Sequence, residues 1–493
     1  MMNQALAAKI CSQGVKVHLA DGIVEEFLFG TNGNTLVVGP PGTGKTESML
    51  KPDILDNKNA SFVIDDKKGA LSRALTPYLE ENGYAVFTFD LINFKGNLTY
   101  NPIEMLSSRE EIMTLAQFLI PKDRKTVDEF WLHTSRQLLV AAIEIGMQEY
   151  GKDMSFRQLC AMIDEIDTNV EDNPTPESLD AIQAEIERER RWTRRQATIH
   201  GYHIADDDEL PDELAEWNED DEAALFGRPS SKKKDENPDG ILRLIKKHLS
   251  QHRFYRGMQD YLASRRSARD TFKSIVISLR TELAKYESEK LFKVMDHNSF
   301  DFKELGKRAV AIFVANSDTD AKFATVIQLF YRDVTKTLLN FADNECEATA
   351  GKLPRHVRFI FDDFCSGIRV PDFELTVANC RSRNISYLIA IQDLDQLRAV
   401  YGADNAGSIS ACMCYQAFYP TKNPTTAKFI ADISGMGAQD VYGMGEGYVF
   451  VWTNGPAKCR RRFQTHDMPE YHESLRLMKE NTKGRQSLVG AVG

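Results

Sequence analysis

The stretch Gly39-Pro40-Pro41-Gly42-Thr43-Gly44-Lys45-Thr46 decides the fold. It fits the pattern Gly-x4-Gly-Lys-Thr, follows the apolar run Thr35–Val38 and precedes a helical stretch. Glycines at these positions let backbone N–H groups close around phosphates, and the start of a helix adds positive potential. We interpret the stretch as a phosphate-binding loop in which Lys45 reaches the β- and γ-phosphates of ATP and Thr46 binds Mg²⁺. A glycine turn without function is the alternative.

Short apolar runs of strand character recur on both sides of this loop. They are Ser61–Ile64, Ala85–Phe89, Val310–Val314, Val357–Phe361, Ile385–Ile391 and Tyr448–Trp452. Helical stretches alternate with these runs, and near-continuous apolar strands are typical of a sheet that is buried on both faces. The sequence therefore predicts an α/β fold with a mostly parallel sheet.

The alternation of strands and helices stops in the middle of the chain. We predict a discontinuous nucleotide-binding domain, residues 1–106 and 300–470, with an all-α domain, residues 107–299, inserted between its third and fourth strands. Residues 471–493 are expected to form a C-terminal tail. Residues 168–238 are very acidic and contain several prolines, so we expect a flexible segment, within which Glu185–Arg195 could form a charged helix; an acidic docking site is the alternative.

Composition excludes several classes of protein. The chain has 493 residues, a net charge of -11 and eight scattered cysteines without a Cys-x-x-Cys pair. Neither a zinc site nor a disulfide scaffold is indicated, and no apolar run approaches the ~18 residues of a membrane span. Residues 1–14 lack a secretory signal pattern. We expect a reduced, cytoplasmic protein. The acidic balance argues against general attraction to nucleic acid but still allows a basic channel.

Two further strand ends carry polar residues suited to hydrolysis. Asp362 and Asp363 follow the run Val357–Phe361. Asp362 would hold the Mg²⁺ shell, and Asp363 would orient or deprotonate the attacking water. Gln392 follows the run Ile385–Ile391 and would face the γ-phosphate, because ligands bind at the carboxyl edge of such sheets. The alternatives are a strand that happens to end in acids and a capping glutamine.

Arg381 and Arg383 lie between these two strands. An arginine at a subunit boundary can stabilise transition-state charge in the active site of a neighbouring subunit. A surface arginine without function is the alternative.

Taken together, these motifs resemble the coupling ATPases of type IV secretion and bacterial conjugation. The matching pieces are residues 39–46, Ile64–Leu71, Tyr100–Pro102, Phe130–Trp131, Thr271–Ile275, Phe361–Phe364, Pro371–Phe373, Arg381–Arg383, Ile391–Gln392, Gln396–Leu397 with Tyr401–Gly402, and Thr426–Ala427. Their order and spacing cover most of the chain, which makes the resemblance specific.

The resemblance implies a hexameric motor of the RecA-like P-loop class with an inserted all-α domain. It places Asp66, Lys68 and Gly69 beside the nucleotide and makes Arg381 the finger that reaches a neighbouring subunit. Three features depart from the family pattern. Asp363 replaces the usual glutamate, the usual N-terminal membrane helices are missing, and the acidic segment is unusual.

The leading hypothesis is an ATP-hydrolysing motor that moves single-stranded DNA, with a bound relaxase-type protein, to a type IV secretion channel. Its partners would be the ATPases of that channel or a separate membrane anchor that recruits it to the inner face of the membrane. A nucleotide-switched receptor for protein cargo and a double-stranded DNA translocase are the alternatives. Candidate DNA contacts are Lys246, Lys247, Arg253, Phe254, Tyr255, Arg256, Arg265, Arg266 and Arg269; a solvated helix face is the alternative for this cluster.

Overall fold

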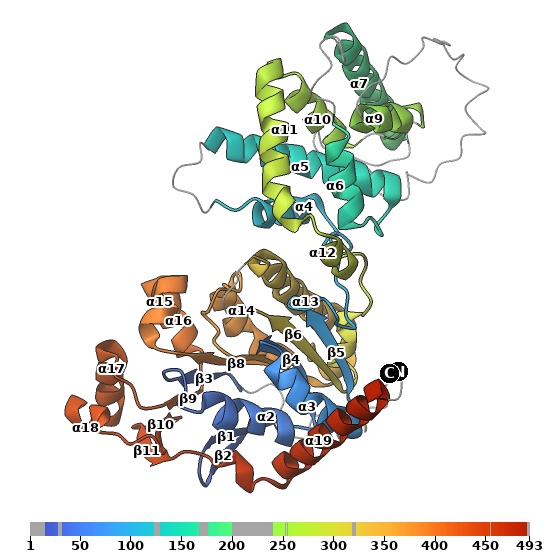
Figure 1. The fold of residues 1–493 in the computed structure, drawn as a ribbon. Helices are drawn as coiled ribbons and strands as arrows, with labels where there is room; N and C mark the ends of the chain where they lie inside the picture. Colours follow the sequence, from blue (N-terminus) through green and yellow to red (C-terminus); the bar gives the residue numbers. More distant parts are fainter. Residues whose placement is uncertain are drawn as a thin grey trace. The chain divides into compact units, whose positions relative to one another are not determined.

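The computed structural model describes residues 15–27, 32–122, 129–166, 176–199, 240–251, 253, 255–317, 322–453 and 455–490. The chain divides into two compact units (Figure 1). We call Met1–Tyr100 with Asn298–Gly493 the sheet unit, and Asn101–His297 the helical unit. Among the described residues, no helix is both long enough and apolar enough to cross a membrane.

One nine-stranded sheet forms the centre of the sheet unit, with the strand order β11-β10-β9-β3-β8-β7-β4-β6-β5. Its strands are β3 Thr35–Val38, β4 Ala60–Lys67, β5 Ala85–Asp90, β6 Val310–Asn316, β7 His356–Phe361, β8 Ile385–Ile391, β9 Tyr415–Phe418, β10 Tyr448–Trp452 and β11 Lys458–Arg461. The strands from β9 to β5 are parallel, whereas β10 and β11 are antiparallel to their neighbours. The predicted α/β fold with a mostly parallel sheet is confirmed.

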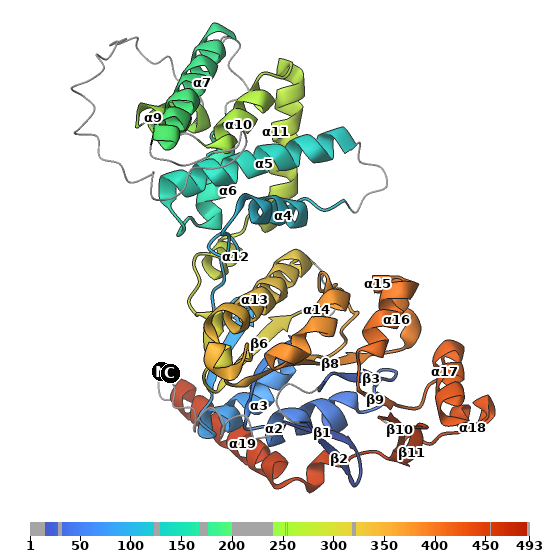
Figure 2. The ribbon, with the colours of Figure 1, turned by 180° about the vertical axis from the view of Figure 1, so that it is seen from behind.

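Helices cover both faces of this sheet, which explains why β3, β6, β7 and β8 are buried at every position. Figures 1 and 2 show α13 and α14 on one face and α2, α3 and α19 on the other. The helices of the sheet unit are α2 Lys51–Asp56, α3 Ala70–Glu81, α13 Ala324–Glu345, α14 Phe373–Asn379, α15 Leu394–Tyr401, α16 Ala403–Ala411, α17 Pro424–Ser434, α18 Ala438–Tyr442 and α19 Pro469–Gly490. The residues expected to form a C-terminal tail thus belong mostly to α19, which contacts α3.

Four strands escaped the sequence analysis: β9, β11 and the separate antiparallel hairpin of β1, Val15–Ala20, and β2, Ile23–Phe27. β9 and β11 have only four residues each, which is too short for an alternating pattern to stand out. β11 is exposed throughout and therefore lacks an apolar signal.

All elements described in the helical unit are helices. They are α4 Arg109–Leu119, α5 Glu129–Tyr150, α6 Phe156–Asp164, α7 Pro176–Ile199, α9 Gly240–Ser250, α10 Arg256–Arg265, α11 Arg269–Leu283 and α12 Glu289–Val294. The long helix α5 lies at their centre, because it contacts α4, α6, α9, α10 and α11.

Helix α7 lies within the acidic segment that was expected to be flexible. Its side chains Leu179, Ile182 and Ile186 are buried, and their spacing places them on one stripe of the helix. This helix contacts α9 and α10. The helix includes the charged helix that the sequence allowed at Glu185–Arg195 and extends it toward the N-terminus, where Leu179 and Ile182 are buried. Residues 167–175 and 200–239 lie outside the described residues.

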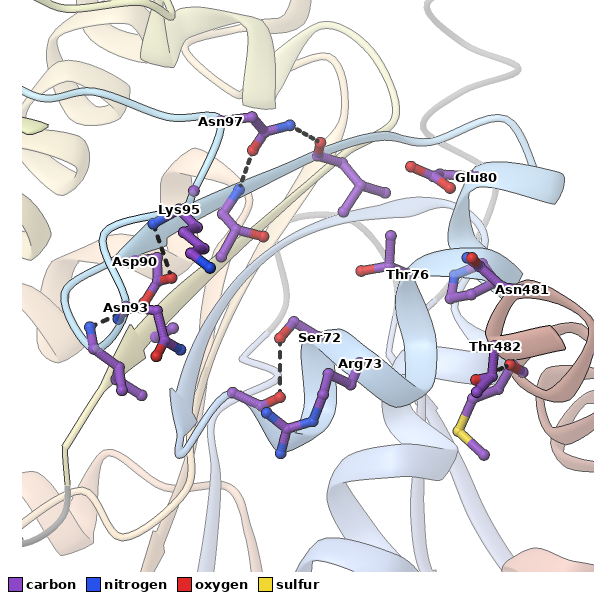
Figure 3. A pocket seen from close by; sticks show the side chains of 18 residues that line it. Ser72, Arg73, Thr76, Glu80, Asp90, Asn93, Lys95, Asn97, Asn481 and Thr482 are labelled. Atoms are coloured by element: carbon purple, nitrogen blue, oxygen red, sulfur yellow. Dashed lines mark hydrogen bonds between the residues drawn. The ribbon is translucent and has the colours of Figure 1, made fainter. Parts of the chain in front are cut away.

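The free edge of the sheet at β5 is closed by the chain's own loop. The Asn97 side chain accepts a hydrogen bond from the Thr88 N–H at 2.6 Å and donates one to the Val86 carbonyl at 3.1 Å (Figure 3). It thereby takes the place of a neighbouring strand and protects the edge from pairing with another chain. A cavity of about 960 Å³ lies beside this edge, between α3, β5, the loop and α19. Asp90 lines this cavity, and its carboxylate accepts hydrogen bonds from three backbone N–H groups of the same loop.

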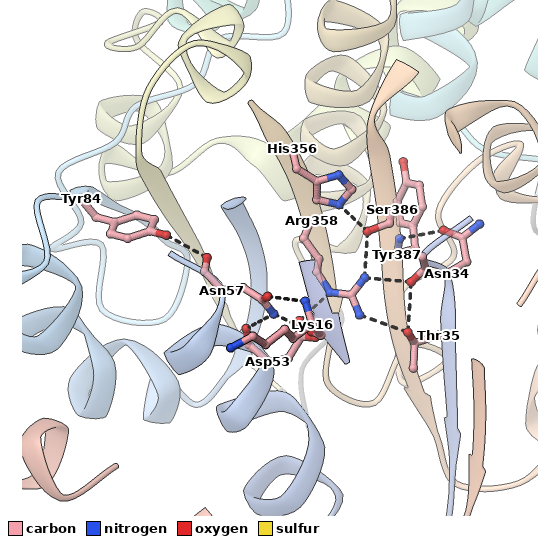
Figure 4. Close-up of polar contacts among 11 residues, drawn as sticks. Lys16, Asn34, Thr35, Asp53, Asn57, Tyr84, His356, Arg358, Ser386 and Tyr387 are labelled. Carbon is pink, nitrogen blue, oxygen red and sulfur yellow. Dashed lines mark hydrogen bonds and ion pairs between the residues drawn. The ribbon is translucent and has the colours of Figure 1, made fainter. Parts of the chain in front are cut away.

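A buried ion pair crosses the interior of the sheet unit. Arg358 of β7 donates from Nε to Asp53 Oδ2 of α2 at 2.5 Å, and both side chains are at most 1% exposed (Figure 4). Its Nη1 donates to Ser386 Oγ at 2.8 Å and to the Gly33 carbonyl at 3.0 Å, and its Nη2 donates to Thr35 Oγ1 at 3.1 Å. One guanidinium therefore joins β7, β8, β3 and the helix that follows the phosphate loop.

We predict that Arg358→Met destabilises the protein by about 3–5 kcal/mol, because it leaves the Asp53 carboxylate buried without its cation. The free energy of unfolding in urea measures this effect. Arg308→Ala is the matched control, since it removes an arginine from the exposed pair with Glu304 and should cost about 0–1 kcal/mol. Equal losses in the two variants would contradict the assignment.

Candidate nucleotide site

The phosphate loop, residues 39–46, has the predicted context. It leaves the carboxyl end of β3 and leads into one turn of π-helix, η1 Thr46–Leu50, which continues as α2. Gly42 and Gly44 have φ values of +80° and +86°, a region that side chains with a Cβ rarely adopt. The two glycines therefore allow the loop to curl around a small anion.

Lys45 lies inside the loop and is 6% exposed. Its Nζ donates to the carbonyls of Gly39 at 2.6 Å and Pro40 at 3.1 Å. Burial lowers the pKa of Lys45, while the carboxylates of Asp363 and Asp362 act in the opposite direction. A phosphate is a stronger, charged acceptor than these carbonyls, so the ammonium group would gain by turning to a bound nucleotide.

Thr46 and Asp362, the two predicted Mg²⁺ residues, are in contact. Thr46 Oγ1 donates to Asp362 Oδ2 at 2.8 Å. Asp362 directly follows β7, which is not the immediate neighbour of β3, since β8 lies between them. Burial raises the pKa of Asp362, and the hydrogen bond from Thr46 opposes that rise. A hydroxyl and a carboxylate are oxygen ligands of the kind that Mg²⁺ takes, so the two residues fit this ion.

Asp363 adopts a left-handed backbone conformation, with a φ of +58°. The turn is held because the Phe364 N–H donates to the Ala390 carbonyl of β8 at 2.8 Å, and the Ser366 N–H donates to the Asp363 carbonyl at 2.9 Å. Aspartate and asparagine tolerate this conformation better than longer side chains do. The backbone thus gives a physical reason for an aspartate where the family usually has a glutamate.

Gln392 and Arg381 lie at opposite ends of β8. Gln392 directly follows the strand, beside the phosphate loop, where the Gly39 N–H donates to the Ile391 carbonyl at 3.0 Å. Arg381 lies in the turn η6, Cys380–Arg383, which precedes the strand. Seven strand residues separate the two ends, a length of roughly 23 Å. Arg381 therefore cannot reach the phosphate loop of its own chain.

The two arginines of this turn differ in their surroundings. Arg383 is paired with Asp343, at 2.8 Å from Nε and 2.9 Å from Nη2. Arg381 is exposed, and its guanidinium makes no hydrogen bond or ion pair with any residue that the structure describes. Of the two, Arg381 is the one whose side chain stays exposed.

Asp66 is the second-last residue of β4, and Lys68 directly follows the strand. Both oxygens of Asp66 are committed to the start of α3, where they accept the N–H groups of Leu71 at 2.8 Å and Ser72 at 2.9 Å. Lys68 is exposed and has a φ of +66°. Each carboxylate oxygen can accept more than one hydrogen bond, so Asp66 remains, with Lys68 and Gly69, a predicted neighbour of the nucleotide.

A buried polar cluster beside this turn was not foreseen from the sequence. Lys67 Nζ lies 3.2 Å from Asp65 Oδ2, 2.7 Å from Asn316 Oδ1 and 3.4 Å from the carbonyl of Ser366. Burial raises the pKa of Asp65 to about 6, with Lys67 opposing the rise. Because Ser366 belongs to the loop after Asp363, Lys67 fixes that loop to β4.

Two more missed residues flank the phosphate loop from the side of β9. The hydroxyl of Tyr419 lies 2.5 Å from Ser48 Oγ of η1. Arg462 Nη1 donates to the carbonyl of Thr43 at 2.8 Å. The run Arg460-Arg461-Arg462 is visible in the sequence, but nothing local shows that its last member meets a loop 419 positions earlier.

The proposed DNA-binding residues of the helical unit are largely engaged with acids and polar groups. Lys247 pairs with Glu149 at 2.6 Å and Arg266 with Asp180 at 2.7 Å. Arg253 donates to Gln148, also within this unit. These contacts reduce the positive potential that the cluster could offer to phosphates. Phe254 and the side chain of Arg269 lie outside the described residues.

Fold and site together define a P-loop nucleotide-binding protein with a mostly parallel sheet. The family model for conjugative DNA transfer by the type IV secretory system matches residues 8–441, and the chain belongs to this family.

Solved structures agree with this family. The bacterial conjugative coupling protein TrwBdeltaN70, in a trigonal form with sulphate, is 13% identical, with 94% of each chain covered and a TM-score of 0.54. TrwB with the non-hydrolysable ATP analogue ADPNP is 13% identical, with 95% of each chain covered and a TM-score of 0.53. TrwB with ADP and Mg²⁺ is 13% identical, with 94% of this chain and 93% of that chain covered and a TM-score of 0.54. The predicted RecA-like fold with an inserted all-α region is thereby confirmed. A comparison with curated proteins gave no match.

We predict that Asp363→Asn lowers ATP turnover by at least about a hundredfold while nucleotide binding persists. Asparagine keeps the left-handed backbone and the size of the side chain but cannot accept the proton of the attacking water. Turnover is measured at saturating ATP and Mg²⁺. Asp372→Asn is the control, because Asp372 has a similar φ of +48° and lies outside the site. Wild-type turnover in Asp363→Asn would mean that the base lies elsewhere.

Proposed function

We propose that this chain is an ATP-hydrolysing hexameric motor that moves single-stranded DNA, with a bound relaxase-type protein, to a type IV secretion channel. The observation that carries this proposal is the contact between Thr46 and Asp362, which joins the phosphate loop to an acidic strand end. Membership in the conjugative DNA transfer family supports the role in transport. We further propose a cytoplasmic protein that a membrane anchor or the ATPases of the channel recruit to the membrane.

In this proposal the loop N–H groups and Lys45 bind the β- and γ-phosphates of ATP. Thr46 and Asp362 would hold Mg²⁺, which supplies charge neutralisation when bound. Asp363 orients the attacking water and accepts its proton, and Gln392 faces the γ-phosphate from the end of β8. The structures of the similar protein TrwB with ADPNP and with ADP and Mg²⁺ support a nucleotide and Mg²⁺ as ligands of this chain.

We predict that Lys45→Ala abolishes ATP hydrolysis, because the ammonium group that reaches the β- and γ-phosphates is lost. The rate of ATP hydrolysis is measured for the variant and the wild type with single-stranded DNA, duplex DNA and no DNA. Stimulation of the wild type by single strands alone supports the motor proposed above. Hydrolysis by the variant at the wild-type rate would refute the site.

The position of Arg381 supports the proposed ring of subunits. This exposed arginine lies at the amino end of β8, about 23 Å of strand away from its own phosphate loop. If it acts on a nucleotide, it must act on that of a neighbouring subunit. A closed ring gives every subunit such a neighbour.

We predict that Arg381→Ala hydrolyses ATP slowly and that mixing it with Lys45→Ala subunits restores part of the activity. The mixed interface can combine an intact loop from one variant with an intact arginine from the other. Arg383→Ala is the control, because that side chain is paired with Asp343 of its own subunit. Activity that is independent of mixing and of protein concentration would contradict the ring.

A nucleotide-switched receptor for protein cargo is the second candidate. The observation that favours it is the pairing of Lys247 and Arg266 with acids of the same unit, which leaves less charge for DNA. An ATPase rate that responds to a cargo protein and to neither form of DNA would favour the receptor. A response to duplex DNA alone would favour a double-stranded DNA translocase.

A further inference from the structure

The chain returns to the phosphate loop near its C-terminal end. Residues 462–471, which we call the strap, connect β11 to the first turn of α19. The Thr465 hydroxyl donates to the carbonyl of Glu47 in η1. The ring of Phe463 lies 4.7 Å from that of His18, and Lys51 Nζ lies 5.8 Å from the ring of Tyr471. The strap is therefore fixed to η1, α2 and β1 at several points.

Arg462 is the strap residue that touches the loop itself. Its Nη1 donates to the carbonyl of Thr43 at 2.8 Å. A Cβ built on Gly44 would lie only 2.6 Å from the same nitrogen, so the guanidinium rests directly against this glycine. The side chain is half-buried, and no carboxylate within the described ranges pairs with it. A cation without a counter-ion thus lies against the segment expected to bind phosphates.

The contact with Arg462 also determines which way the N–H of Gly44 points. In a trans peptide the C=O and N–H groups point to opposite sides. Because Arg462 holds the carbonyl of Thr43 on its own side, the N–H of Gly44 points away from the strap. A charge-assisted hydrogen bond to the carbonyl also polarises the peptide and strengthens the N–H as a donor.

We infer that Arg462 is a positioning residue for phosphate binding, which turns the Thr43–Gly44 peptide so that its N–H faces the nucleotide. This inference rests on the proposed function of the loop as an ATP site. Arg462 belongs to the strap. Nucleotide binding should therefore stabilise the ordered conformation of the strap, and an ordered strap should strengthen nucleotide binding, because such coupling is reciprocal.

The test uses the full chain and measures the Kd of ADP and of ATP, each with Mg²⁺. Arg462→Ala and Arg462→Gln should weaken binding by about ten- to hundredfold, because the charged donor to the Thr43 carbonyl is lost. Arg462→Lys should recover much of the affinity, since an ammonium group keeps both the charge and the donor. Arg461→Ala is the matched control: it removes an exposed arginine at the preceding position, on β11.

Thr465→Val separates positioning from mere attachment, because it removes the strap's bond to Glu47 and leaves Arg462 in place. Affinity close to wild type in this variant supports the inference, and a loss as large as that of Arg462→Ala overturns it. Unchanged affinity in Arg462→Ala also overturns it.

If Arg462→Ala unfolds at a lower temperature, Arg462→Lys decides: restored binding supports positioning, and lost binding overturns it. A wild-type chain that binds no nucleotide would instead refute the proposed function.

Hydrogen exchange gives a second measurement. In the wild type and in Arg461→Ala, ADP should protect the backbone of residues 462–471 from exchange. In Arg462→Ala, at ADP concentrations that saturate the variant, that protection should shrink. Equal protection in the three proteins would overturn the coupling of strap and loop.

Discussion

The buried pair of Arg358 and Asp53 is the constraint on which the arrangement of the site depends. Arg358 lies in a strand that is buried at every position, and a guanidinium removed from water is tolerated only when its donors are satisfied. Here Asp53, Ser386, Thr35 and a backbone carbonyl take them up. The cation thereby fixes the position of β7 relative to α2, the helix that follows the phosphate loop.

The position of Asp362 at the end of β7 follows from this placement of the strand. Side chains two and four residues further along a strand point to the same side as the first, so Asp362 continues the face on which Arg358 meets α2. That face is also the side of the phosphate loop, and Asp362 consequently reaches Thr46 at 2.8 Å although β8 separates their strands. The turn at Asp363 and the bond from Lys67 to Ser366 then hold the second carboxylate in place.

The opposite flank of the loop is built by the last part of the sheet unit. β9 brings Tyr419 against η1, and the strap after β11 brings Arg462 against Gly44. The loop lies early in the chain and is thus enclosed by residues from the later part of the sheet unit's sequence. The short antiparallel strands β10 and β11 contribute no proposed catalytic residue. They matter to the site because they lead into the strap that contacts the loop.

The sequence by itself determined the phosphate loop, the main parallel strands, the place of the helical insertion and the acidic strand end. These features depend on glycine spacing and on runs of apolar residues, which are local properties of the chain. Only the tertiary structure decided that β8 lies between β3 and β7, that Arg381 lies too far from its own loop and that Asp66 caps α3. It also decided the contacts of Arg358 and Arg462, since each joins residues hundreds of positions apart and no local pattern records such a partner.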